Sequence, residues 1–207
     1  MSVEELPLAP TLTDAESVVI AGPPMSGKYE LMHRILGEAA DRAIVLSTGH
    51  DAERVRTDYT ETTGHDPDSI AIVDCVTREQ GSDIADTELN KYASSPKNLT
   101  ELGVKFTELA ENWDDQPETS VGLHSLSQLL MYWDADRIYR FVRVLLGRTR
   151  NQGWLTVAVI NSTMHDERTL HTLLDPFDTI VDTRTTDEGW EMRLRNRSSS
   201  PTPWEQF

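Results

Sequence analysis

Residues 18–28 read Val18-Val19-Ile20-Ala21-Gly22-Pro23-Pro24-Met25-Ser26-Gly27-Lys28. An apolar strand, a glycine, four residues, Gly-Lys and the start of a helix follow one another, which is the order of a phosphate-binding P-loop (Walker A motif). The glycines let backbone N–H groups turn inward around a phosphate, and the helix points its positive end at the same anion. We expect Lys28 to reach the β and γ phosphates; a glycine turn that simply leads into a helix is the alternative. The predicted nucleotide-binding residues are Gly22, Pro23, Pro24, Met25, Ser26, Gly27, Lys28 and Tyr29.

On both sides of this loop, strand and helix signals alternate along the chain. Such alternation predicts an α/β fold in three layers, with a mostly parallel sheet and helices on both faces. The turn signal Asp187-Glu188-Gly189 adds a C-terminal antiparallel hairpin. The segment 81–95 is weakly patterned, and we expect a loop with some helix there. Strands are predicted at 17–21, 43–48, 70–76, 119–123, 154–160, 179–183 and 190–195, and helices at 28–40, 51–63, from Ser95-Pro96 onward, 136–150 and 166–174.

The ends of the chain differ in composition from its middle. Residues 1–15 contain Pro7 and Pro10 and show no periodicity, so a loose arm is expected. Residues 16–197 are predicted to form one nucleotide-binding domain, and residues 198–207 a tail. Trp204 and Phe207 in the tail are either a docking motif or side chains that pack back on the same domain.

The net charge of −16 limits the partners and the environment. Only four of the basic residues are lysines, and an acidic, lysine-poor surface predicts a halophilic protein whose charge repulsion is screened by salt. The same balance disfavours nucleic acid as a partner, because that requires a basic surface. The apolar runs are too short for membrane insertion, the N-terminus lacks a hydrophobic signal core, and a cytoplasmic location is expected. The single cysteine, Cys75, lies in an apolar run and is predicted to be a buried thiol.

Beyond the loop, the chain resembles the RecA/KaiC-like P-loop ATPases, and in particular small haloarchaeal members of that superfamily. The resemblance covers about residues 15–197. It rests on the loop, on the strand 70–76 with Asp74, on Ser120-Val121-Gly122-Leu123-His124-Ser125-Leu126-Ser127 and on the C-terminal hairpin. It implies a RecA-like fold that binds ATP, either with Mg²⁺ or without it.

Three positions depart from the pattern of that family. Tyr29 stands where a Ser or Thr normally binds Mg²⁺. His124 stands where the resemblance places the Asp of the second nucleotide motif, which orders metal-bound water. The acidic catalytic residue after the second strand is absent from Ser47-Thr48-Gly49-His50, and only Asp51 could replace it. The weak catalytic candidates are therefore Asp51, His124 and Asn161.

The resemblance also implies a polar sensor residue, Asn161 or Ser162, and arginines that reach the phosphate of a neighbouring subunit. Arg193, Arg195 and Arg197 are the candidates, with a solvated strand face as the alternative. These arginines predict a possible homo-oligomer, although a different protein partner is also possible.

Three histidines, His50, His124 and His165, fall near the predicted carboxyl ends of strands. Imidazoles beside carboxylates suit zinc or nickel, so a metal site is one hypothesis. The alternative, which we favour, is that these residues line the nucleotide crevice without a metal.

Together these features predict an ATP-binding regulatory protein with degenerate hydrolysis motifs, acting as a nucleotide-dependent signalling or assembly switch. ATP is favoured over GTP because no Asn-Lys-x-Asp motif is present. The alternatives are an active but slow ATPase and a nucleotide-free structural adaptor. Lys28 favours binding, whereas Tyr29, His124 and the absent glutamate favour lost hydrolysis.

Overall fold

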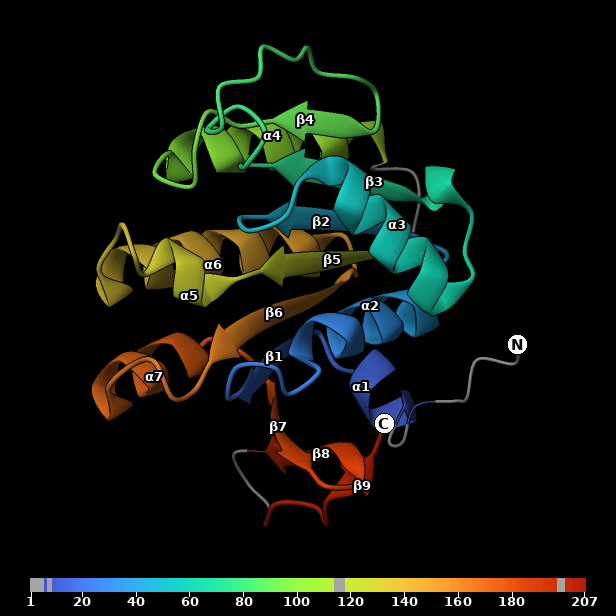
Figure 1. Cartoon of the computed structure of the whole chain (residues 1–207), viewed down its shortest axis with the longest axis vertical. Coiled ribbons are helices and arrows are strands. Elements are labelled where there is room, and N and C mark those ends of the chain that lie inside the picture. The colour runs from blue at the N-terminus through green and yellow to red at the C-terminus, as the bar shows by residue number, and fades with distance from the viewer. Residues whose placement is uncertain (1–5, 7–8, 114–117, 197–199) are drawn as a thin grey trace.

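The fold is given by a computed structural model that describes residue 6 and residues 9–113, 118–196 and 200–207. Within these ranges nine strands form one sheet in the order β4-β3-β2-β5-β6-β1-β7-β8-β9 (Figure 1). Strands from β4 to β7 pair in parallel, and β7, β8 and β9 pair antiparallel. The strands are β1 (Ser17–Gly22), β2 (Arg42–Ser47), β3 (Ile70–Asp74), β4 (Asn90–Tyr92), β5 (Thr119–His124), β6 (Leu155–Asn161), β7 (Thr179–Thr186), β8 (Gly189–Asn196) and β9 (Glu205–Gln206).

The central strands are buried on both faces, which explains their nearly continuous runs of apolar residues. In β1, Val19 faces one layer of helices and Val18 the other, as the two-residue period of a strand requires. The register brings the strand ends level, because Gly22 pairs with Asn161 and Ser47 with His124. The predicted α/β fold with a mostly parallel sheet and a C-terminal antiparallel hairpin is confirmed.

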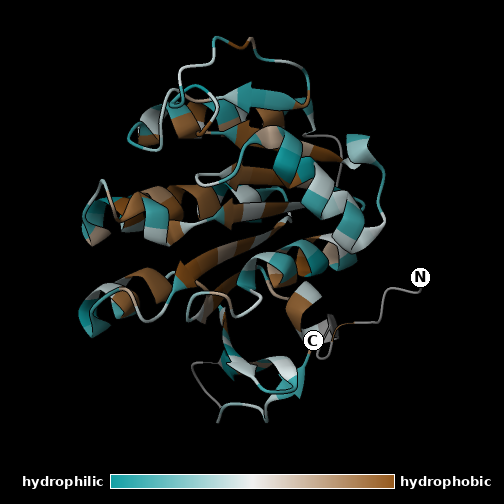
Figure 2. Ribbon diagram, in the orientation of Figure 1, coloured by the Kyte–Doolittle hydropathy of each residue, from teal (hydrophilic) through white to brown (hydrophobic). Residues whose placement is uncertain are grey.

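Two layers of helices cover the sheet. The helices α1, α2 and α3 contribute to one apolar cluster, and α4, α5, α6 and α7 to the cluster on the opposite face. The apolar residues of the strands and of the inner helix faces concentrate between the layers (Figure 2). Across the described ranges, no helix is long and apolar enough to cross a membrane. The helices are α1 (Ala9–Thr13), α2 (Lys28–Ala39), α3 (Ala52–Thr63), the 3-10 turn η1 (Pro67–Ser69), α4 (Leu99–Asn112), α5 (Leu126–Leu129), α6 (Ala135–Asn151) and α7 (Glu167–Leu174).

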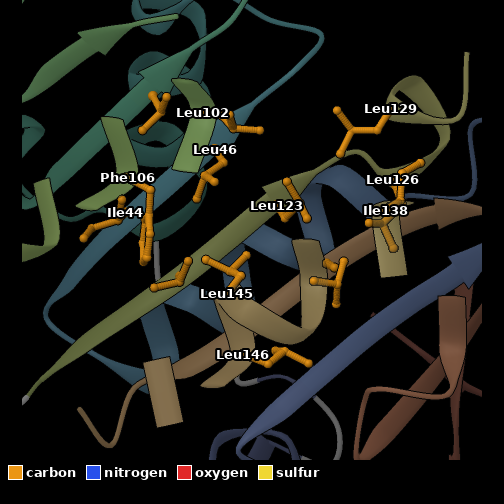
Figure 3. Close-up of a cluster of buried hydrophobic side chains, with 14 of the residues drawn as sticks. Ile44, Leu46, Leu102, Phe106, Leu123, Leu126, Leu129, Ile138, Leu145 and Leu146 are labelled. Carbon is orange, nitrogen blue, oxygen red and sulfur yellow. The ribbon is translucent and has the colours of Figure 1, made fainter. Parts of the chain in front are cut away.

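The cluster under α4, α5 and α6 follows from the spacing of apolar residues on those helices. Leu102 and Phe106 of α4, four residues apart, point at the sheet together with Ile138 and Leu145 of α6 (Figure 3). All four are at most 4% exposed. Cys75 is fully buried in the same cluster, which confirms the predicted buried thiol.

Two local expectations are wrong. The segment 81–95 contains no helix and instead forms the short edge strand β4, which pairs with β3. The helix expected to begin at Ser95-Pro96 begins at Leu99, because Asn98 is its N-cap and accepts from the Glu101 backbone N–H at 3.1 Å. An N-cap with a glutamate three residues later is a stronger start signal than a proline.

The described residues at both ends of the chain contain secondary structure that the sequence did not indicate. In the expected loose arm, residues 9–13 form α1, and Leu6 and Leu12 are buried against the domain. In the expected tail, β9 pairs with β8, and the Phe207 backbone N–H donates to the Trp190 carbonyl oxygen at 3.3 Å. Trp204 lies against the guanidinium groups of Arg184 and Arg193. The described part of the tail therefore packs back on its own domain; residues 1–5, 7–8 and 197–199 lie outside the described ranges.

Candidate functional site

The loop between β1 and α2 has the backbone that its glycines predict. Gly27 is the N-cap of α2 and lies in the left-handed region at φ 74°, and Met25 lies there too at φ 60°. A second feature also favours glycine at position 27, because a Cβ atom there would lie 2.6 Å from the Trp190 ring. A larger residue at Gly27 would thus meet both backbone strain and a steric clash.

The ammonium group of Lys28 is buried inside the loop, and the residue is only 7% exposed. Its Nζ atom donates to the Pro23 carbonyl oxygen and to Ser26 Oγ, the latter at 3.3 Å. No carboxylate among the described residues pairs with it. Burial lowers its pKa to about 8, so it is still protonated at pH 7. A buried ammonium held only by neutral oxygen atoms can accept an anion as a partner.

The C-terminal hairpin braces this loop. Trp190 Nε1 donates to the Met25 carbonyl oxygen at 3.0 Å, and Thr185 Oγ1 donates to the same oxygen at 3.2 Å. Ser26 Oγ and Thr183 Oγ1 are hydrogen-bonded at 2.6 Å. Sequence reasoning missed Trp190 because the residue reads as an ordinary strand position, 165 residues from its partner.

A cleft of about 600 Å³ opens beside the loop, at the carboxyl ends of β1, β5 and β6. This edge is where ligands bind in parallel α/β sheets. Of the described residues that line it, only the exposed Glu30 carries a carboxylate, and sequence reasoning did not single it out. The lining residues are Pro24, Met25, Ser26, Gly27, Lys28, Tyr29, Glu30, His124, Ser125, Val159, Asn161 and Trp190.

Four rings pack together behind Lys28. The Tyr29 ring centroid lies 4.4 Å from that of His33, 4.9 Å from His50 and 4.6 Å from His124. The rings of His50 and His124 stack at 5.3 Å, with an angle of 9° between their planes. We call Tyr29, His33, His50 and His124 the ring cluster. His33 was missed from the sequence because it reads as an interior helix position.

The imidazoles of the ring cluster are neutral at pH 7. Burial lowers the pKa of His33 to about 4 and that of His124 to about 3, and it also lowers the pKa of His50. Neither ring nitrogen of His33 has a hydrogen-bond partner in the described part of the chain, and His124 Nδ1 has none either. At the position where the resemblance implies an Asp, the site therefore holds an uncharged ring.

The candidate carboxylates have structural partners. Asp51 is the N-cap of α3, where its side chain accepts from the Arg54 backbone N–H at 3.0 Å, and it does not line the cleft. Asp74 is fully buried and accepts from the backbone N–H groups of Ala52, at 2.8 Å, and Val76, at 2.7 Å. Neither carboxylate is placed to activate water in the cleft.

Asn161, by contrast, lies in the cleft wall at the end of β6. Its backbone N–H donates to Ser127 Oγ at 2.8 Å, and its amide Nδ2 contacts Met164 Sδ at 3.2 Å. Within the described ranges the side chain thus contacts a weak acceptor only, which leaves it available to a polar ligand group. Of the three weak catalytic candidates, the structure brings His124 and Asn161 to the cleft and keeps Asp51 out of it.

The three histidines of the metal hypothesis do not converge. His50 and His124 stack, but His165 Nε2 is hydrogen-bonded to Ser127 Oγ at 2.9 Å. Over the described ranges, no group of three or more His, Cys, Asp or Glu residues could hold a metal ion.

Two of the arginines proposed to reach a neighbouring subunit are paired within the chain. Arg193 Nε and Arg195 Nη2 each lie 3.1 Å from an oxygen of Asp182. These ion pairs within the chain account for both side chains without a neighbouring subunit, and the alternative of a solvated strand face stays open. The third, Arg197, lies outside the described residues.

A family model matches residues 15–183 and is described as a family of unknown function (DUF7504). The match covers most of the chain, which therefore belongs to this family. It includes the loop, the ring cluster and Asn161, but ends before Trp190 and the tail. No curated protein matches the chain.

Proposed function

We propose that this protein binds ATP at the loop Gly22–Lys28 and uses occupancy of the site as a regulatory signal. The observation that carries the proposal is the buried ammonium of Lys28, without a carboxylate partner in the described residues, at the wall of the cleft. A phosphate would replace the Pro23 carbonyl oxygen as the partner of Lys28.

The start of α2 supplies the other half of the argument. Its N-cap Gly27 offers no side-chain hydrogen bond, so no cap side chain competes with an anion for the backbone N–H groups of the first turn. Other helices of the domain begin differently. At the start of each, the N-cap side chain accepts a hydrogen bond from a backbone N–H, as in α3, α4, α5, α6 and α7. An uncapped helix end beside a buried lysine suits a phosphate group.

A RecA-like arrangement is part of the proposal. In its support, β1 and β5, which carry the loop and the second-motif position, are separated in the sheet by β6 alone. Both strands end at the same cleft. In a RecA-like site the phosphate loop and the second nucleotide motif would act on the same nucleotide. The positions of β1 and β5 at one cleft support this arrangement.

We infer that hydrolysis is slow. Phosphoryl transfer depends on positioning and on Mg²⁺ that neutralises charge. The phenol of Tyr29 packs in the ring cluster, and His124 is an uncharged ring in place of a carboxylate. Of the described residues that line the cleft, the exposed Glu30 alone offers a carboxylate to Mg²⁺.

The test is to titrate the protein calorimetrically with ATP in molar KCl with Mg²⁺ and to measure turnover in the same sample. We expect saturable binding with turnover below about one per second, well under the typical enzyme value of about 10 per second. Faster, Mg²⁺-dependent turnover that Lys28→Ala abolishes would establish an active ATPase instead.

A nucleotide-free adaptor is the second candidate, and one observation favours it. The polar side chains of the loop already have partners, since Ser26 and Lys28 donate to the Pro23 carbonyl oxygen and Ser26 is also hydrogen-bonded to Thr183. Absence of ATP binding in a sample with a cooperative thermal transition would select this candidate.

A further inference from the structure

An apolar groove of about 380 Å³ runs between α4 and α6. We call it the α4–α6 groove; it shares no lining residue with the nucleotide cleft. Its floor is apolar, and its rim carries three arginines. The lining residues are Leu99, Thr100, Gly103, Phe106, Thr107, Arg137, Arg140, Phe141, Val144, Leu145 and Arg148.

Gly103 keeps this groove open. It lies in the interior of α4, where a glycine is less favourable than alanine by about 1 kcal/mol. No close contact requires it, since a Cβ there would meet only Phe141 Cε2 at 3.9 Å. The backbone of Gly103 has ordinary helical geometry, so the residue is not needed for a turn. The effect of its missing side chain is the space in the groove.

The charge of the groove is opposite to that of the protein. The helix α6 carries five of the fifteen arginines and a single acidic residue, Asp136, in a chain of net charge −16. Arg148 Nη1 donates to Thr107 Oγ1 at 3.0 Å and its Nη2 lies 3.8 Å from Glu111 Oε1, whereas Arg137 stacks on Trp133 at 3.7 Å. Arg140 is exposed and makes no ion pair in the described part of the structure. At Arg137 and Arg140 the rim therefore presents positive charge that no carboxylate of the described residues pairs with.

The apolar part of the groove is also incompletely covered. Val144 is 74% exposed, and Phe141, three residues earlier on α6, is half-buried beside it. An apolar floor between two helices, with cations along the rim, is complementary to a helix that carries apolar residues on one face and carboxylates beside them. Nucleic acid would engage the arginines but would leave the apolar floor unused.

We propose that the α4–α6 groove docks an acidic amphipathic helix of a protein partner. Apolar side chains of that helix fill the space above Gly103 and pack on Phe141 and Val144. Its carboxylates pair with Arg140 and Arg137. The proposal does not depend on nucleotide binding, because the groove and the cleft are lined by different residues.

The test uses a fluorescent synthetic helix of about 18 residues, or five turns, with leucines at i, i+3, i+4 and i+7 and glutamates elsewhere. Binding is measured by fluorescence anisotropy in KCl. Gly103→Leu fills the groove, and we expect it to weaken binding by at least about ten-fold. This variant removes a helix-interior glycine, so its melting temperature should not fall. The matched control is Gly147→Leu on α6, where nothing lies within 4 Å, and its affinity should equal that of wild type.

Charge is tested separately. Replacing the glutamates of the peptide by glutamines, or making Arg140→Glu, should each weaken binding by about ten-fold at moderate salt, with a smaller loss in molar KCl where screening acts within about 3 Å. Equal binding by a peptide of the same composition in scrambled order would overturn the proposal, as would wild-type affinity in Gly103→Leu. Two further results would also overturn it: displacement of the peptide by an oligonucleotide, and self-association of the protein that Gly103→Leu abolishes.

Discussion

The helices α2 and α3 begin at the same edge of the sheet but in different ways. Asp51 caps α3 with its own carboxylate, which accepts from the Arg54 backbone N–H. Gly27 precedes α2 and offers no cap, and Lys28 lies buried directly behind it. The comparison teaches that a helix start closed by a side chain serves the fold alone, whereas an uncapped start beside an ammonium retains its donors for a ligand.

The ring cluster joins the two helix starts. Tyr29 and His33 come from the first turns of α2, and His50 directly precedes Asp51. Uncharged rings thus occupy the region between a proposed phosphate site and a closed helix end. On the proposed function, this separation would let the loop bind a phosphate although the neighbouring groups do not support hydrolysis.

The largest predicted effect concerns the ring cluster and pH. The pKa of His33, about 4, and of His124, about 3, lie below the unfolded value of 6.5, so the unfolded chain binds more protons as the pH falls. The contribution of these two histidines to stability is therefore fully present above pH 6.5, and it is lost as the pH falls from there towards their pKa values in the folded protein. Between pH 7 and pH 5 we expect the free energy of unfolding to drop by about 4 kcal/mol for the two groups together. Chemical denaturation at a series of pH values measures this.

A variant isolates the contribution of His33. His33→Phe removes two buried nitrogens that have no hydrogen-bond partner among the described residues, so it should raise stability at pH 7 and reduce the drop by about 2 kcal/mol. His171→Gln, at an exposed histidine on α7, is the control and should leave the drop unchanged. A drop of the same size in His33→Phe would show that His33 is not buried in its neutral form.

The next largest effect concerns the requirement for glycine at position 27, the N-cap of α2. Gly27→Ala should destabilise the protein by about 3 kcal/mol, from about 1–2 kcal/mol of left-handed backbone strain and the remainder from the clash with Trp190. In a Trp190→Ala background the loss should shrink to the backbone strain and the remaining contact with Phe207, whose Cζ would lie 2.9 Å from the added Cβ. Urea denaturation of the four proteins gives both terms, and equal losses in the two backgrounds would mean that Trp190 does not contact Gly27 closely.

The smallest effect concerns the closed helix start. Asp51→Ala removes the cap of α3 and should lower the free energy of unfolding by about 1 kcal/mol. Nucleotide affinity and any residual turnover should be unchanged, because Asp51 does not line the cleft. Loss of turnover in a variant of otherwise normal stability would restore Asp51 as a catalytic residue.

The sequence predicted what consecutive residues determine. The strand β1, the loop and α2 follow from a run of adjacent residues, and the apolar stripe of α4 from its own periodicity. The strand β4 was missed because three residues carry no usable pattern and because its partner, β3, lies in another segment.

Only part of the candidate site could be predicted from the sequence. Its lysine and His124 could be named from their motifs, but the positions of His33 and Trp190 depend on contacts between distant segments. Asp51 was a candidate only because it follows β2, and its use as a cap became evident from the hydrogen bond to Arg54. A carboxylate that follows a strand, where a catalytic residue is expected, can thus serve as a helix cap instead.

The central claim is that the uncapped start of α2, with Lys28, is the phosphate site. The most direct test is calorimetric titration of ATP into wild type and Lys28→Ala under identical conditions, with Lys97→Ala as the surface control. The claim predicts that Lys28→Ala loses about 1.5–3 kcal/mol of binding free energy, or about 10- to 150-fold in affinity, while Lys97→Ala binds as wild type does. Superimposable titration curves for wild type and a folded Lys28→Ala would contradict it.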